Sequence, residues 1–163
     1  MASFSMTTQK LNGNDSYYTP RDAFNDLSLY IPDVGKVWEC FPGESESEQF
    51  MADAFPCEVV ATDTDYFETA PPEGTTLIVS NPPYSIKKRV FDRLRDIGLP
   101  FMMLVPIGTF SKQYVRWAQE EMQLIVPRKR IHFIVGGEQT RRTPFDVVWL
   151  CWRCDLEKDI TYM

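Results

Sequence analysis

The stretch TTLIVSNPPYSIKKRVFDRL, residues 75–94, places two consecutive prolines where a strand passes into a helix. Residues 75–81 have three consecutive apolar side chains at their centre, Leu77 to Val79, which predicts a strand buried on both faces, like the central strands of parallel sheets. From residue 85 to 98 the apolar side chains recur at helical spacing, and Gly98 is placed to end the helix. A strand, a Pro-Pro corner and a helix therefore indicate one βα unit of an α/β fold.

The same alternation continues on both sides of this unit. Upstream, the pattern predicts a helix within residues 17–32 with Thr19 as its N-cap, strands at 36–41 and 57–63, and a helix at 46–55. Downstream it predicts a strand at 100–108, a helix at 110–122, and strand-like runs at 123–127, 130–137 and 144–154 around a Gly-Gly turn. We predict a three-layer, Rossmann-like α/β domain over residues 17–163, with a mostly parallel sheet and a C-terminal antiparallel hairpin. Residues 1–16 are patternless and are expected to form a flexible lead-in.

Composition favours one globular domain. The chain has 163 residues, of which 44% are hydrophobic and 13% aromatic. Its apolar runs are much shorter than the ~20 residues that a membrane helix needs, and no signal peptide is evident, so we expect an intracellular protein that is not secreted. Cys151 and Cys154 have C-x-x-C spacing, but they follow an alternating strand pattern, so we expect reduced thiols rather than a metal site.

Charge is distributed unevenly. The net charge is −6, residues 37–86 contain ten acidic and no basic side chains, and residues 87–163 contain fourteen basic against nine acidic ones. Such an arrangement is compatible with a cationic or sulfonium ligand on one side and a polyanion on the other.

In parallel α/β sheets, ligands bind beyond the carboxyl ends of the strands. The first such loop contains Glu39, Phe41 and Gly43 and lacks the G-x-G-x-x-G pattern, which argues against a pyrophosphate site. Glu39, at the end of its strand, is instead suited to accept a hydrogen bond from an ammonium group.

The second loop begins with Asp63, 24 residues after Glu39, close to the spacing at which an acid meets a ribose in nucleotide-binding domains. Asp65 offers a further acceptor, and the rings of Tyr66 and Phe67 are suited to flank a purine. An amino-acid end near Glu39 and a ribose near Asp63 suit S-adenosylmethionine better than NAD.

The corner Asn81-Pro82-Pro83-Tyr84 predicts an amine-binding site. An exocyclic amine on a base is a poor nucleophile, because its lone pair is delocalised into the ring. If the Asn81 side-chain oxygen and the Pro82 carbonyl accept its hydrogens, the nitrogen can become pyramidal and direct its lone pair at a methyl sulfonium. Pro82 and Pro83 stiffen the loop and donate no competing N–H, and Tyr84 can stack on the base.

With these residues, the chain resembles the S-adenosylmethionine-dependent amino-methyltransferases of the N6-adenine type, whose hallmark is [DNS]-P-P-[YFW], and especially their small viral and phage members. The resemblance implies catalytic roles for Asn81 to Tyr84 and a cofactor-contacting segment at Tyr17 to Pro20, in which Tyr18, Thr19 and Pro20 are the expected cofactor contacts. Residues 39–45 and 61–68 resemble the cofactor loops, and residues 127–133 a segment of the small members. Only seventeen residues separate Asp63 from Asn81, so we expect one helix–strand unit of the usual fold to be missing.

The resemblance implies a nucleic-acid substrate, DNA more than RNA. A basic set is suited to phosphate contacts without sequence preference: Lys87, Lys88, Arg89, Arg128, Lys129, Arg130, Arg141 and Arg142. No segment resembles a target-recognition domain, so we expect low specificity or a protein partner that supplies it. The only histidine, His132, is expected to pack in a strand rather than to contact the target.

Two alternatives stay open. The first is a catalytically degenerate binding module or one subunit of a heteromeric methyltransferase. The second is an active enzyme with another planar amine as substrate, such as cytosine N4 or a protein amide, since the Asn-Pro-Pro-Tyr corner recognises the amine rather than adenine as such.

Overall fold

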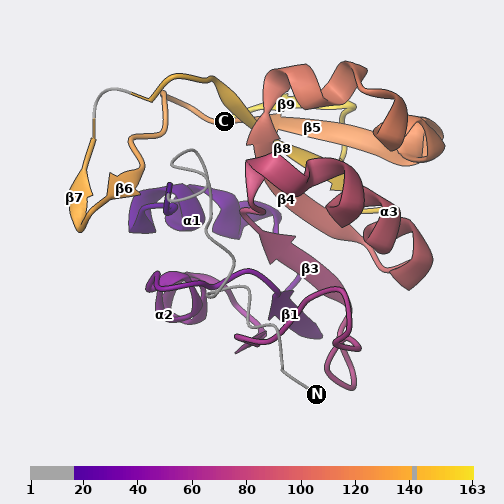
Figure 1. The fold of residues 1–163 in the computed structure, drawn as a ribbon, viewed down its shortest axis with the longest axis horizontal. Helices are drawn as coiled ribbons and strands as arrows, with labels where there is room; N and C mark the ends of the chain where they lie inside the picture. The colour runs from indigo at the N-terminus through magenta and orange to yellow at the C-terminus, as the bar shows by residue number, and fades with distance from the viewer. Residues whose placement is uncertain (1–16, 141–142) are drawn as a thin grey trace.

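The computed structural model describes residues 17–140 and 143–163, which form an α/β domain around one central sheet (Figure 1). The strand order is β2-β1-β3-β4-β8-β5-β9. The bounds are β1 Lys36–Glu39, β2 Glu58–Ala61, β3 Leu77–Ser80, β4 Phe101–Pro106, β5 Met122–Val126, β8 Val147–Trp152 and β9 Ile160–Tyr162. Strand β8 runs antiparallel to β4 and β5, and the other pairings are parallel, as the sequence predicts.

Helices cover both faces of this sheet, which confirms the predicted three layers. The elements are α1 Arg21–Leu27, η2 Ser28–Tyr30, α2 Ser47–Ala54, η3 Tyr84–Ile86, α3 Lys87–Ile97, η4 Ile107–Ser111 and η5 Gln113–Glu121, where η denotes a 3-10 helix. Helices α1 and α2 pack in one apolar cluster, and α3 and η5 pack in the other. Strand β3 contributes to both, with Leu77 and Val79 in the first cluster and Ile78 in the second, because successive side chains of a strand point to opposite faces.

Two details of the helices differ from expectation. The single helix predicted at residues 110–122 is a pair of 3-10 segments, and the spacing of buried Val115 and Ala118, three residues apart, suits that tighter helix. At the start of α1, Pro20 holds the N-cap position and no side chain caps the helix, so the prediction of Thr19 as N-cap is wrong. The Thr19 side chain is buried instead.

The Gly-Gly turn belongs to a small hairpin outside the main sheet. Strands β6 (Ile134–Val135) and β7 (Glu138–Gln139) pair with each other, and Gly136 and Gly137 join them with φ of 60° and 84°. Two consecutive positive φ angles are what a tight hairpin turn requires, and glycine adopts them without strain. The antiparallel component of the main sheet is β8, so the predicted antiparallel C-terminal part is present but the strand predicted at 130–137 is reduced to two residues.

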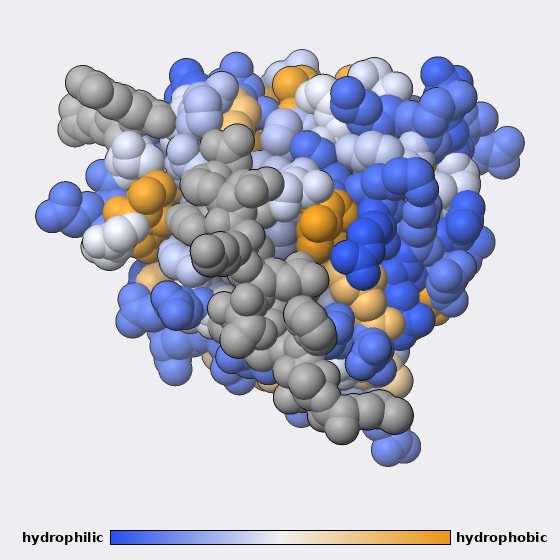
Figure 2. Space-filling view, in the orientation of Figure 1, coloured by the Kyte–Doolittle hydropathy of each residue, from blue (hydrophilic) through white to orange (hydrophobic). Residues whose placement is uncertain are grey.

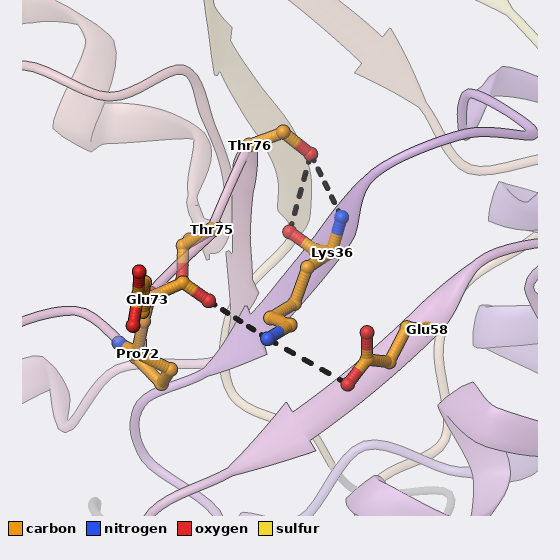
Figure 3. Close-up of polar contacts among 6 residues, drawn as sticks. All are labelled: Lys36, Glu58, Pro72, Glu73, Thr75 and Thr76. Atoms are coloured by element: carbon orange, nitrogen blue, oxygen red, sulfur yellow. Dashed lines mark hydrogen bonds and ion pairs between the residues drawn. The ribbon is translucent and has the colours of Figure 1, made fainter.

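The predicted absence of one helix–strand unit is confirmed. Strand β2 lies at the edge of the sheet, and the chain passes from β2 to β3 through residues 62–76 without a further strand. Lys36 fastens this short connection: its Nζ donates a 2.7 Å hydrogen bond to the Glu73 carbonyl and lies 3.6 Å from Glu58 (Figure 3). Thr76 Oγ1 adds hydrogen bonds to the Lys36 N–H and carbonyl.

Gly35 makes the close approach to Thr76 possible. Its φ is 105°, in the region that favours glycine, and a Cβ added there would lie 2.2 Å from Thr76 Oγ1. The amino end of β1 therefore depends on a glycine at this position.

In residues 17–140 and 143–163, no helix combines the length and apolar character that crossing a bilayer requires. The four cysteines are free thiols.

Candidate active site at the carboxyl edge of the sheet

The loops that carry the candidate residues meet at one edge of the sheet. Because β1 to β5 run parallel, the segments that follow them lie at their common carboxyl edge, and β8, which runs the other way, begins there. Residues 17–20 reach this edge through β6, since Tyr18 and Ile134 exchange backbone hydrogen bonds of 3.0 and 2.8 Å.

Asn81 directs its side-chain oxygen away from the protein's own donors. Its Nδ2 donates a 2.8 Å hydrogen bond to the Tyr17 carbonyl. A carbonyl only accepts, so this contact fixes which end of the amide faces Tyr17. Asn81 Oδ1 is buried and has no hydrogen-bond partner among the described residues. An unpaired buried acceptor costs about 1–3 kcal/mol, which a ligand N–H would recover.

The rest of the corner is rigid and apolar. Pro82 and Pro83 are buried, and Pro83 leads into η3 with φ −60° and ψ 123°. The Tyr84 ring is half-buried, lies edge-on to Phe145 with centroids 5.1 Å apart, and has Lys87 Nζ 5.4 Å from its centroid. Burial raises the pKa of Tyr84 well above its ordinary value, so its hydroxyl keeps its proton. In the described part of the chain this buried hydroxyl has no partner.

Phe145 links three segments of the site. Its ring centroid lies 5.2 Å from Tyr17, 5.1 Å from Tyr84 and 6.0 Å from Phe133, all with edge-to-face geometry. Edge-to-face pairs of this kind each add about 0.5–1.5 kcal/mol beyond area burial. The Tyr17 carbonyl holds the Asn81 side chain, and Tyr84 lies three residues after Asn81. The cluster of rings around Phe145 therefore orients the Asn-Pro-Pro-Tyr corner. Sequence reasoning missed Phe145, and it placed Tyr17 in the expected cofactor segment without its contact to Asn81, since neither contact follows from a motif.

We expect Phe145→Ala to loosen the Asn81 amide. Loss of the three edge-to-face contacts of Phe145, one of which is with Tyr17, frees Tyr17 to move. Hydrogen exchange of the Asn81 Nδ2 protons should therefore become about 10-fold faster, equivalent to about 1.4 kcal/mol. Side-chain amide NMR measures this directly. Phe145→Tyr keeps the ring and should restore slow exchange, and Phe110→Ala, at an exposed ring, should leave it unchanged. Equal exchange rates in Phe145→Ala and the unmodified protein would show that Phe145 does not position Asn81.

Glu39 lies inside the protein, which corrects the expectation of an acid open to an ammonium group. Its side chain is 1% exposed, and Oε1 accepts hydrogen bonds from the Ser80 hydroxyl and, at 2.9 Å, from the Phe41 N–H. Burial raises its pKa to about 7, against the lowering effect of these hydrogen bonds. Glu39 thus ties the end of β1 to the end of β3 and shapes the loop that begins at Cys40.

This raised pKa predicts a pH-dependent stability. The folded protein holds the Glu39 proton up to about pH 7, whereas the unfolded chain loses it near pH 4.5, so the free energy of unfolding should fall by roughly 3 kcal/mol between these values. Glu39→Gln cannot titrate and should remove this decline. Denaturant unfolding of both proteins from pH 4 to 8 tests it: the stability difference between variant and wild type should grow across this range and level off above pH 7. A constant difference would contradict it.

The predicted cofactor segment lies beside the predicted cofactor loop. A Cβ on Gly43 would lie 3.5 Å from the Tyr18 ring, and Gly43 has a φ of 53°. Thr19 is 3% exposed, and within the described residues its buried Oγ1 has no hydrogen-bond partner. Tyr18, Thr19 and the Gly43 turn therefore come together. Thr19 Oγ1 here and Asn81 Oδ1 in the corner are two buried polar atoms that no described residue pairs.

The second loop separates the roles of its two acids. Asp65 Oδ1 accepts a 2.9 Å hydrogen bond from the Phe67 N–H, and its carbonyl accepts those of Glu68 and Thr69, so Asp65 builds the turn. Asp63 is exposed at the edge. Asp63 is thus the acid that is available to a ligand.

Tyr66 is part of the core, which corrects its expected place beside a purine. It is 1% exposed, packs against Phe41 and Trp38 at centroid distances of 4.6 and 6.0 Å, and donates a 3.2 Å hydrogen bond to the Val90 carbonyl. Phe41 remains half-exposed above it. The Phe67 ring is covered by Arg89, whose guanidinium carbon lies 4.1 Å from the ring centroid.

Some of the predicted phosphate-contacting side chains form hydrogen bonds or ion pairs within the protein, and others are exposed to solvent. Arg130 donates to the Thr143 carbonyl and pairs with Asp146 at 3.7 Å, so it fastens the loop before β8. Lys88 forms an exposed ion pair with Asp92 at 2.7 Å. Arg128 and Lys129 are exposed. Arg141 and Arg142, like the lead-in predicted for residues 1–16, lie outside the described residues.

His132 does not lie in a strand, which corrects the expected strand-packing role; it is half-buried between β5 and β6. Its buried Nδ1 has no hydrogen-bond partner in residues 17–140 and 143–163. Within these same ranges, no group of three or more His, Cys, Asp or Glu side chains is arranged to hold a metal ion.

Comparisons with known proteins identify the fold. No family model matches the chain, and no curated protein matches it significantly. The 23S rRNA methyltransferase ErmE has a similar structure, with a TM-score of 0.56 over 84% of this chain and 69% of that one at 16% identity. A proposed class I S-adenosylmethionine-dependent methyltransferase from Listeria monocytogenes gives a TM-score of 0.50 over 96% of this chain and 68% of that one at 8% identity. The chain has the class I methyltransferase fold. Within this methyltransferase fold, Asn81, Gly43 and Asp63 all lie at the carboxyl edge of the sheet, where α/β folds bind their ligands.

Proposed function

We propose that the protein is an S-adenosylmethionine-dependent methyltransferase that modifies the exocyclic N6 amine of adenine in DNA. The observation that carries the proposal is the Asn81 amide, which is held by Tyr17. Its Oδ1, at the carboxyl edge of β3, is buried and has no partner among residues 17–140 and 143–163. A buried acceptor beside two prolines that donate no N–H is suited to an incoming amine.

The mechanism follows from what the corner can accept. Asn81 Oδ1 accepts a hydrogen bond from one N–H of the target amine. The Pro82 carbonyl, in the stiff Pro82-Pro83 segment, accepts a hydrogen bond from the second N–H. With both hydrogens engaged, the amine nitrogen becomes pyramidal and its lone pair is free to attack. Tyr84 flanks the base, and its protonated hydroxyl is available as a donor. When bound, S-adenosylmethionine would supply a methyl group from its sulfonium sulfur, leaving a neutral thioether, and the methylated amine would release one proton to water.

The residues beside this corner fit such a cofactor. Thr19 Oγ1, buried and unpaired within the described chain, is a hydrogen-bonding group for its polar amino-acid end. The Gly43 turn next to Tyr18 lets the backbone approach closely, and exposed Asp63 can accept from the ribose hydroxyls. Phe41 offers a half-exposed ring. Pro20 fixes the start of α1 beside Thr19. Glu39 and Asp65 shape the two loops from within.

The phosphates of the nucleic acid are contacted by four basic side chains: Lys87, Lys88, Arg128 and Lys129. Contacts of this kind carry no sequence preference. A protein partner that supplies target specificity is part of the proposal. RNA is the second candidate substrate, and the structural likeness to a 23S rRNA methyltransferase favours it.

The test combines binding with transfer. Isothermal titration calorimetry should show S-adenosylmethionine binding by the purified protein, and incubation with the methyl-labelled cofactor should label adenine in DNA or RNA, as resolved by nucleoside mass spectrometry. Asp63→Ala should weaken cofactor binding, whereas Asp53→Ala, at an exposed acid paired with Arg21 on α1, should not. Cofactor binding without transfer to any nucleic acid would support a subunit that needs a partner. Absence of both would support a degenerate binding module.

A further inference from the structure

Two large apolar side chains are exposed at the same edge as the candidate site. Ile107 is 55% exposed and Phe110 is 52% exposed, both on η4, which follows β4 directly. The face shown in Figure 2 is mostly hydrophilic, with apolar residues in small separate patches. Exposed apolar pairs next to a ligand site are more informative than single ones elsewhere, because such patches mark binding surfaces.

The scaffold beneath this pair is well anchored. The Ile107 N–H donates a 2.9 Å hydrogen bond to the Asp146 carbonyl, and the Thr109 side chain between the two exposed residues is 1% exposed. The Thr109 carbonyl accepts the Lys112 N–H at 3.1 Å, which closes the turn. Exposure of Ile107 and Phe110 is therefore a property of a fixed element.

The pair lies between the amine-binding corner and a basic segment. On one side, Phe145 precedes Asp146 in the chain and contacts Tyr84 of the corner. On the other side, Asp146 pairs with Arg130, which follows exposed Arg128 and Lys129 after β5. The contacts thus run from Tyr84 through Phe145 and Asp146 to Arg130, and Ile107 joins them at Asp146.

Cations lie at both ends of this line. Lys87 and Lys88 begin α3 next to the corner, and Arg128 and Lys129 follow β5. In the sheet, β4 and β8 separate β3 from β5, which places their ends about 14 Å apart at the usual strand spacing. At about 3.4 Å per nucleotide of a stacked strand, this distance corresponds to roughly four nucleotides.

We propose that η4 and the two flanking basic segments form a binding track for single-stranded nucleic acid, in which an unpaired base next to the target stacks on Phe110 and packs against Ile107. This inference rests on the proposed function and adds the strandedness of its substrate. An aromatic ring can stack only on a base whose face is open, whereas phosphate contacts alone serve single strands and duplexes alike. The protein should therefore prefer unpaired targets.

Binding experiments without cofactor test the track independently of methyl transfer. Fluorescence anisotropy should show at least 10-fold tighter binding of a short single-stranded DNA containing adenine than of the same sequence as a duplex. Phe110→Ala should weaken single-strand binding about 10-fold with an unchanged salt dependence. Lys129→Ala should instead lower the slope of log affinity against log salt by about one. Leu29→Ala, at an apolar residue before β1 that is 81% exposed, is the matched control.

Three results would overturn the track: equal affinity for single strand and duplex, unchanged single-strand binding in Phe110→Ala, or loss of self-association in Phe110→Ala, which would make the pair a contact between copies of the chain. If methylation is normal and any of these three results is found, the binding track is rejected and the proposed function is retained. Strong single-strand preference without methylation would reject the proposed function and retain the track.

Discussion

Replacing Asn81 with alanine should lower the methyl-transfer rate about 100- to 1000-fold and leave the affinity for S-adenosylmethionine unchanged. The magnitude is that of removing one preorganised hydrogen-bonding group from a developing charge. Asn81 Oδ1 is the buried acceptor of the corner, and the expected cofactor contacts come from other segments, around Thr19, Gly43 and Asp63. Single-turnover transfer and calorimetry on the same preparation separate the two effects.

Two further variants sharpen this result. Asn81→Asp keeps an acceptor but replaces the donor that holds the Tyr17 carbonyl with a carboxylate, so an intermediate loss is expected. Asn25→Ala, at an exposed asparagine on α1, is the matched control and should be unchanged. If Asn81→Ala transferred methyl groups at the normal rate, Asn81 would not be the amine acceptor.

Gly35→Ala should cost about 2–6 kcal/mol of stability. The added Cβ would lie 2.2 Å from Thr76 Oγ1, and alanine would have to adopt a φ of 105°. Overpacking and an unfavourable φ each cost about 1–3 kcal/mol. Thr76 cannot easily yield, because its Oγ1 is hydrogen-bonded to both backbone groups of Lys36 (Figure 3). Denaturant unfolding measures the loss.

Gly108→Ala is the matched control for Gly35. Nothing lies within 4 Å of a Cβ at Gly108 and its φ is not positive, so the change should stay within about 0.5 kcal/mol. Gly35→Ala and Thr76→Ala should each lower stability when made alone. The double variant should lose less than the sum of these two losses, since removing Thr76 Oγ1 relieves its overlap with the added Cβ. A loss below 1 kcal/mol in Gly35→Ala would show that the short connection after β2 adapts.

The elements around the Pro-Pro corner could be predicted because local patterns specify them. The apolar run at β3, the helical spacing of α3 and Gly98, which has a φ of 71° at the C-cap, are each visible in a few consecutive residues. The missing helix–strand unit could also be predicted, since chain length alone limits what residues 62–76 can form. The helix predicted at 110–122 was wrong in type because 3-10 and α-helices share similar apolar spacing over one or two turns.

The interior of the site could not be predicted in the same way. Whether an acid after a strand faces solvent depends on its neighbours in space, and buried Glu39 accepts a hydrogen bond from Ser80, 41 residues away. Tyr66 is in the core because Trp38 and Val90 surround it. Phe145 contacts Tyr84, 61 residues before it, and Tyr17, 128 residues before it. Contacts of this range have no signature in one sequence.

The bond formed at the amine is the most direct measure of the proposed function. DNA or RNA whose adenines carry ¹⁵N at the exocyclic amine is incubated with the protein and S-adenosylmethionine that carries ¹³C in its methyl group. The expected product is a nucleoside with a one-bond ¹³C–¹⁵N coupling in its NMR spectrum, absent with Asn81→Ala. A methylated nucleoside without that coupling, or no ¹³C in any nucleoside while the cofactor binds, would contradict transfer to adenine N6.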